Sequence, residues 1–124
     1  MTRPQFESLI VRAVAGLPEE FRSKLGDLVI QAADAPTRAD LAEAGIVDPD
    51  DTLYGFFQGT PLPERSLGDL PDPPSRILVY QRPLEEDFGD DEAALVDEIR
   101  ITLLHELGHY LGLSEEELDR LGFG

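Results

Sequence analysis

Apolar positions in the last third of the chain recur at the spacing of an α-helix. From about Asp90 to about Leu111, hydrophobic side chains repeat every three or four residues. These side chains are Val96, Ile99, Leu103, Leu107 and Leu111. The pattern predicts a long helix with one buried side, and the acidic residues at its start suit the positive end of a helix.

A second helix is predicted at the start of the chain, from Pro4 to Ala15. Its apolar positions are Phe6, Leu9, Ile10, Ala13 and Val14. Pro4 suits the first turn of a helix, where a backbone N–H has no partner within the helix. Shorter helical turns are expected at Pro18–Leu25 and at Thr37–Ala44, the latter beginning at a threonine cap.

Short segments with strand composition lie between these helices. They are Asp27–Ala32, Leu53–Gln58 and Arg76–Gln81, and they are rich in β-branched or aromatic side chains. In Arg76–Gln81 both alternating sets of side chains are largely apolar, so both faces are expected to be covered. Gly55 lies inside the second segment, where a missing side chain indicates close approach of another part of the backbone.

The remaining segments are predicted to connect these elements. Asp48–Asp51 is dense in turn-forming residues and is expected at the surface. Five prolines between Gly59 and Ser75 exclude regular structure there. Pro83 is expected to close the third strand, and no helix is predicted in the acidic stretch Leu84–Asp91.

The charge of the chain limits its partners. Ten Lys and Arg residues stand against 26 Asp and Glu residues, giving a formal net charge of −16. Such a chain repels phosphate backbones and anionic lipid headgroups, so neither nucleic acid nor a membrane is an expected partner. It attracts divalent cations, although excess surface carboxylate also serves solubility alone.

Length and cysteine content indicate the number of domains and the cellular compartment. A chain of 124 residues holds one modest core, so a single domain over residues 1–124 is predicted. The absence of cysteine excludes disulfides and thiolate metal sites and suits a reducing compartment. The first residues lack the apolar run of a signal peptide, and no segment has the ~18 apolar residues of a membrane span. The expected location is the cytoplasm.

The two histidines of the chain lie on the predicted long helix, at His105 and His109, with Glu106 directly after the first. This is the H-E-x-x-H arrangement that binds zinc on one face of a helix. At about 100° per residue, both imidazoles fall opposite the apolar stripe and can reach one tetrahedral zinc. Glu106 would then act as the general base toward water. The alternative is a pair of surface or capping histidines.

The motif continues as H-E-x-x-H-x-x-G-x-x-E, ending at Glu115. Gly112 adopts positive φ without steric cost, so it is predicted to end the helix and to turn the chain back toward the metal. The extended pattern resembles the signature of metzincins, whose last position is His or Asp. By this resemblance Glu115 is the expected third zinc ligand.

Local sequence also offers another role for the residues after Gly112. Ser114 followed by Glu117 is typical of a capping box that opens a last helix. Acidic residues in a first helical turn also suit the helix dipole. If Glu115 is not the ligand, Asp119 and Glu116 are the next candidates.

The order of elements resembles the small bacterial zincin-like metallopeptidases, sometimes described as minimal zincins. The motif that carries the resemblance covers about the last fifth of the chain, and the methionine turn of metzincins is missing because Met1 is the only methionine. The resemblance implies an α+β, minimal zincin-like fold. In it, a small mixed sheet of about three strands packs on the N-terminal helix and on the active-site helix, which a short terminal helix follows.

The leading hypothesis is a cytoplasmic zinc metallopeptidase that acts on a peptide or protein substrate. The edge of Leu53–Gln58 or of Arg76–Gln81 would hold an extended peptide by backbone pairing. Candidate oxyanion stabilisers are Tyr54, Tyr80, Arg82, Arg100 and Tyr110, and the alternative role for each is packing or surface charge. Few residues remain to wall the far side of the groove, which predicts weak intrinsic activity, a protein partner that completes the groove, or a narrow substrate. The competing hypothesis is a non-catalytic metal-binding or protein-interaction module on the same scaffold.

Overall fold

The computed structural model describes residues 1–26, 28–45, 53–59 and 75–120, except for the side chain of residue 115. In chain order the elements are α1 (Arg3–Ala15), α2 (Glu19–Arg22), β1 (Val29–Ala33), α3 (Arg38–Glu43), β2 (Gly55–Gln58), β3 (Arg76–Tyr80), α4 (Gln81–Phe88), α5 (Glu92–Tyr110) and α6 (Glu115–Arg120). The predicted turn at Asp48–Asp51 and all but the two ends of the predicted loop Gly59–Ser75 lie outside the described residues. Within the described ranges, no helix combines the length and apolar character needed to cross a membrane.

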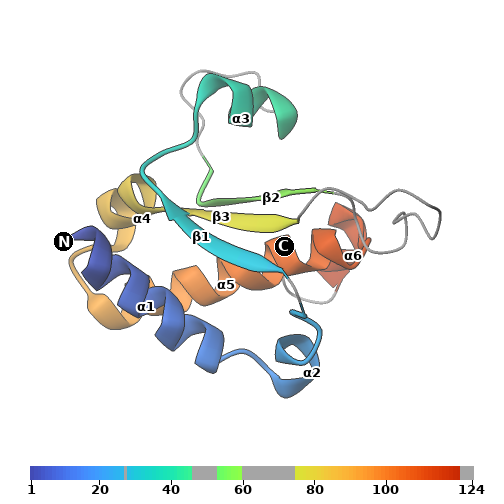
Figure 1. The fold of residues 1–124 in the computed structure, drawn as a ribbon, viewed down its shortest axis with the longest axis horizontal. Coiled ribbons are helices and arrows are strands. Elements are labelled where there is room, and N and C mark those ends of the chain that lie inside the picture. Colours follow the sequence, from blue (N-terminus) through green and yellow to red (C-terminus); the bar gives the residue numbers. More distant parts are fainter. Residues whose placement is uncertain (27, 46–52, 60–74, 121–124) are drawn as a thin grey trace.

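The strands form a three-stranded mixed sheet in the order β1-β3-β2. The central strand β3 pairs in parallel with β1 and antiparallel with β2. Helices α1 and α5 lie on one side of this sheet and α3 lies on the other, as Figure 1 shows. The predicted α+β architecture, with a small mixed sheet on an N-terminal and a C-terminal helix, is confirmed.

The core lies between the sheet and helices α1 and α5. Its main buried members are Phe6, Leu9, Ile10 and Ala13 of α1, Leu95, Ile99, Leu103 and Leu107 of α5, and Phe57, Ile77 and Val79 of the sheet. The predicted apolar stripe of α5 is therefore largely buried. Thr2 and Gln5 form a capping box at the start of α1, with Pro4 in its first turn. Packing along the whole length of α5 fixes its rotation, and with it the direction of its polar side chains.

Helix α4 was not predicted, because the sequence of the acidic stretch after β3 indicates no regular element. Helix α4 starts directly after Tyr80, and Pro83 lies in its first turn, where proline is well tolerated. Leu84 is fully buried, and the ring of Phe88 packs edge-on against Tyr54 with centroids 5.6 Å apart. These two apolar anchors stabilise a helix in a segment whose composition is mostly acidic.

Candidate metal centre

The C-terminal turns of α5 bring His105, Glu106 and His109 together. One potential ligand atom of each residue lies within 4.8 Å of the others. The two imidazole side chains are 26% and 29% exposed, so they lie outside the buried stripe, as the helical spacing predicted. The structure thus gathers the three residues of the H-E-x-x-H motif, whose metal-binding and catalytic roles stay predictions.

The distance between the two imidazoles fits a shared metal ion. Two nitrogens that each lie ~2.0–2.1 Å from a tetrahedral zinc are about 3.3–3.4 Å apart. The Nε2 atoms of His105 and His109 are 3.2 Å apart. The same distance suits an N–H···N hydrogen bond in which one imidazole donates and the other accepts. The neighbouring carboxylate is therefore needed to distinguish a metal site from two hydrogen-bonded histidines.

The carboxylate of Glu106 is buried but faces both histidines. Its side chain is 8% exposed. Its Oε1 atom accepts a hydrogen bond from the backbone N–H of Phe57 in β2, at 2.8 Å. Its Oε2 atom lies 3.7 Å from Nε2 of His105 and 3.9 Å from Nε2 of His109. Oε2 is thus nearly equidistant from the two imidazole nitrogens. A carboxylate oxygen in this position can act as a general base toward a water molecule bound beside those nitrogens.

A cleft of about 280 Å³ opens in front of these groups, between α5, β2 and the end of α3. The described residues that line it are Ala44, Leu53, Gly55, Phe56, Phe57, His105, Glu106 and His109. One wall is therefore apolar and comes from α3 and β2. The other wall is polar and comes from α5, so the cleft offers both a surface for side chains and a site for chemistry.

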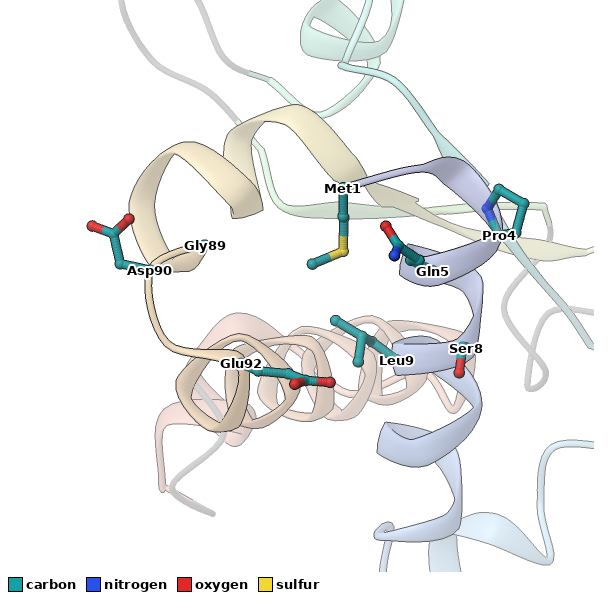
Figure 2. Close-up of a pocket in the computed structure, with 8 residues that line it drawn as sticks. All are labelled: Met1, Pro4, Gln5, Ser8, Leu9, Gly89, Asp90 and Glu92. Carbon is teal, nitrogen blue, oxygen red and sulfur yellow. The ribbon is translucent and has the colours of Figure 1, made fainter.

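A larger hollow of about 640 Å³ lies between the start of α1 and the junction of α4 with α5, as Figure 2 shows. It is lined by Met1, Pro4, Gln5, Ser8, Leu9, Gly89, Asp90 and Glu92. No histidine lines it, and among the described residues it contains no cluster of metal-ligating side chains. The smaller cleft at the histidines is therefore the candidate functional site.

Gly108, between the two histidines, lets α6 pack directly on α5. A Cβ atom at Gly108 would lie 2.2 Å from Cδ2 of Leu118, a fully buried side chain. Beyond α5, Gly112 has a φ of 85°, and its N–H donates to the carbonyl of His109 at 3.0 Å. The N–H of Leu113 donates to the carbonyl of Gly108 at 2.9 Å. This pair of bonds is a Schellman motif, which confirms the predicted turn at Gly112.

The predicted third ligand, Glu115, is the first residue of α6, but its side chain lies outside the described part of the chain. The predicted capping box is present, because the Ser114 hydroxyl accepts from the N–H of Glu117 at 3.1 Å and the N–H of Ser114 donates to the Glu117 carboxylate at 3.5 Å. The reserve candidates Glu116 and Asp119 are exposed and do not belong to the described cluster at the histidines. The role of Glu115 stays a prediction.

The tyrosines proposed as oxyanion stabilisers make other contacts. The Tyr54 hydroxyl donates to Asp87, and this bond, with partial burial, raises the pKa of Tyr54 to about 12. Tyr80 is fully buried, and its hydroxyl donates to Asp40 of α3 at 3.0 Å. Burial, followed by that hydrogen bond, raises the pKa of the Tyr80 phenol. The Tyr80–Asp40 bond joins α3 to the central strand, so it supports the cleft wall formed by α3.

The other three candidates are also placed away from the cleft. Arg100 pairs with Asp97 on its own helix at 2.8 Å, and Arg82 is exposed on α4. Tyr110 is buried against Phe57, with ring centroids 5.6 Å apart. None of the five predicted oxyanion residues is among the described residues that line the cleft.

Sequence reasoning missed the contribution of the β2 backbone to the site. The Phe57 N–H that binds Glu106 carries no signal in residue type, because every residue except proline has such a group. The one available sign was Gly55, whose position inside a strand predicted a close backbone approach. A close approach is found at Gly55, where a Cβ atom would lie 3.0 Å from the backbone carbonyl oxygen of Leu78 and 2.5 Å from Cγ2 of the Thr102 side chain on α5.

Comparison with known proteins adds one finding. A family model described as zincin-like metallopeptidase matches residues 25–124, a range that includes the histidine cluster and every described residue of the cleft. No curated protein matches the sequence to a significant degree.

Proposed function

The chain belongs to the zincin-like metallopeptidase family, and we propose that it hydrolyses peptide bonds at the cluster of His105, Glu106 and His109. Its three-stranded mixed sheet on α1 and α5 is the minimal zincin-like fold that the sequence predicted. The observation that carries the proposal is the position of Glu106 Oε2, 3.7 and 3.9 Å from the two imidazole nitrogens and beside a cleft.

In this proposal His105 and His109 hold a zinc ion through their Nε2 atoms, with Glu115 as third ligand. When bound, zinc polarises a substrate carbonyl and increases the acidity of water. The Schellman turn at Gly112 and the capping box at Ser114 restrict the first turn of α6, which suits a ligand at its first residue. The net charge of −16 favours approach of the cation.

Glu106 moves the proton in the reaction. Its Oε1 atom is held by the Phe57 N–H, so its Oε2 atom takes the proton from the attacking water. The same atom then gives that proton to the nitrogen of the leaving amine. Burial of the carboxylate next to the cleft keeps competing bulk water away from this transfer.

An extended peptide would bind along β2. The central strand β3 has a partner on each side, whereas β2 is an edge strand of the sheet and lines the cleft. Pairing with a strand edge supplies affinity through backbone hydrogen bonds, and pockets for alternate side chains supply specificity. Because the Phe57 N–H is bound to Glu106, the peptide would pair with the other outward backbone groups of β2. The apolar wall of Ala44, Leu53 and Phe56 suits an apolar side chain of the peptide. A protein partner that walls the far side of the groove is compatible with this arrangement.

Zinc analysis and peptide cleavage together test the proposal. Purified protein supplied with zinc is expected to retain about one equivalent, and less than about half an equivalent contradicts the metal site. Cleavage of a mixed peptide library is followed by mass spectrometry. Glu106→Gln is expected to retain zinc and to lose cleavage, whereas Glu86→Gln, which alters an exposed carboxylate on α4, retains both.

The outcomes separate the two hypotheses for this scaffold. Cleavage that survives in Glu106→Gln would show that another group is the base. Zinc retention without cleavage of any library peptide would support the non-catalytic metal-binding or interaction module instead. Loss of zinc on Glu115→Ala supports that residue as ligand, and unchanged zinc affinity excludes it.

A further inference from the structure

The outer edge of β2 is defined by its hydrogen bonds to β3. The N–H of Tyr80 donates to the carbonyl of Tyr54 at 2.9 Å, and Phe56 stands opposite Leu78 in the antiparallel register. In an antiparallel pair, successive residues alternate between bonding to the partner strand and facing away from it. Gly55 and Phe57 therefore direct their backbone groups away from β3, toward the cleft.

One of these outward groups is already bound to the base. The N–H of Phe57 donates to Oε1 of Glu106 at 2.8 Å. A carboxylate held through one oxygen by a fixed backbone group has few orientations left for the other. The position of Oε2 beside both imidazole nitrogens thus depends on where β2 lies relative to α5.

Gly55 determines how close β2 comes to α5. A Cβ atom at this position would lie 2.5 Å from Cγ2 of Thr102 and 3.0 Å from the carbonyl oxygen of Leu78. It would also lie 3.6 Å from Cγ of Glu106. A side chain at residue 55 therefore forces β2 or Thr102 to shift, and a shift of β2 away from α5 carries the Phe57 N–H with it.

We propose that Gly55 is a positioning residue for Glu106: its missing side chain lets β2 approach α5 so that the Phe57 N–H orients the carboxylate toward the two histidines. The catalytic meaning of this arrangement rests on the proposed peptidase function. The coupling between residue 55 and the Phe57–Glu106 hydrogen bond is a separate physical statement and is tested without substrate.

Amide hydrogen exchange in protein labelled with ¹⁵N-phenylalanine tests the coupling. The amide of Phe57 faces Glu106, whereas the amide of Phe56 faces β3 and serves as an internal control on the same strand. Gly55→Ala is expected to speed exchange at Phe57 by about 10- to 100-fold, as for loss of a hydrogen bond to a charged group. Exchange at Phe56 is expected to change much less.

Thr102→Ser provides the matched rescue, because it removes the Cγ2 atom that the new methyl would meet and keeps the hydroxyl. The double variant Gly55→Ala, Thr102→Ser is expected to recover most of the protection at Phe57. Thr102→Ser alone should leave both amides protected. Glu106→Gln keeps an oxygen acceptor and should preserve protection, whereas Glu106→Ala should remove it even if Gly55→Ala does not fold.

The results that would overturn the positioning role of Gly55 differ from those that would overturn the proposed peptidase function. Protection of Phe57 that persists in Gly55→Ala excludes the positioning role, and equal acceleration at Phe56 and Phe57 shows only a loosened sheet. For the active enzyme, Gly55→Ala is expected to lower kcat more than it changes KM. A protein that binds no zinc and cleaves no peptide refutes the proposed function, while the exchange pattern still decides the coupling.

Discussion

Replacing Gly108 with alanine tests whether α6 packs directly on α5 at this residue. The new methyl group would lie 2.2 Å from Cδ2, 3.2 Å from Cγ and 3.3 Å from Cδ1 of Leu118. The 2.2 Å contact requires a shift of Leu118 or of α6. Because Leu118 is fully buried, even a change of its rotamer must displace packed neighbours.

The magnitude follows from two opposing effects. Alanine stabilises a helix interior over glycine by about 0.8–1.0 kcal/mol, whereas overpacking a filled site costs typically about 1–3 kcal/mol. We expect Gly108→Ala to lower the free energy of unfolding by about 0–2 kcal/mol, and Leu118→Ala to lower it by about 2–5 kcal/mol. In the double variant the methyl fills part of the space that the leucine leaves. The combined loss should therefore fall short of the sum by about 1–3 kcal/mol.

Urea unfolding followed by circular dichroism measures these energies, with zinc affinity measured on the same proteins. Gly16→Ala is the control, because a Cβ atom there meets its nearest atom at 3.5 Å, an ordinary contact. The changes in the free energy of unfolding caused by Gly16→Ala and Leu118→Ala should add in the double variant. If the changes in the free energy of unfolding for Gly108→Ala and Leu118→Ala also add to within about 0.5 kcal/mol, the direct packing of α6 on Gly108 is refuted. Unchanged zinc affinity in Gly108→Ala would argue against a ligand on α6.

Three further predictions concern single groups. Gly112→Ala forces a side chain onto a φ of 85° and should cost about 1–2 kcal/mol, seen as a lower urea midpoint. Asp91→Ala removes the cap whose carboxylate accepts from the N–H groups of Ala93 and Ala94, and should cost about 0.5–2 kcal/mol, while Asp91→Asn costs less. Because the Tyr54 pKa rises from 10.0 to about 12, the stability that its protonated phenol contributes is complete below pH 10 and is lost as pH rises toward 12. Ultraviolet titration of tyrosinate should show late ionisation in the native protein, to which the buried Tyr80 also contributes, and Tyr54→Phe should lower the amplitude of this late step without abolishing it.

The sequence predicted the parts of the site that depend on neighbouring residues. The orientation of His105 and His109 follows from helical spacing, and the turn at Gly112 follows from the conformational freedom of glycine. The capping box at Ser114 is equally local. These features need no knowledge of distant segments, so single-sequence reasoning was sufficient for them.

The features that failed or stayed open depend on contacts distant in sequence. Helix α4 is stabilised by Leu84 in the core and by Phe88 against Tyr54, neither of which local composition reveals. The choice of β2 as edge strand depends on the order of the sheet, which strand composition does not specify. The candidate oxyanion residues were chosen by type, and their hydrogen bonds to Asp87 and Asp40 could not be foreseen.

Two glycines allow close packing on the part of α5 that carries the histidines. Gly55 lets β2 approach Thr102 of α5, and Gly108 of α5 lets Leu118 of α6 approach. Glycine weakens a helix interior by about 0.8–1.0 kcal/mol relative to alanine, so local helix stability and the packing of the site favour different residues at position 108. Stabilising α5 by alanine at this position should therefore succeed only when Leu118 is shortened as well. The same conflict operates at Gly55, where a side chain that would strengthen the strand meets Thr102 and, in our proposal, displaces the backbone N–H that holds Glu106. Close packing around the histidines thus requires two residues that are unfavourable for the elements in which they lie.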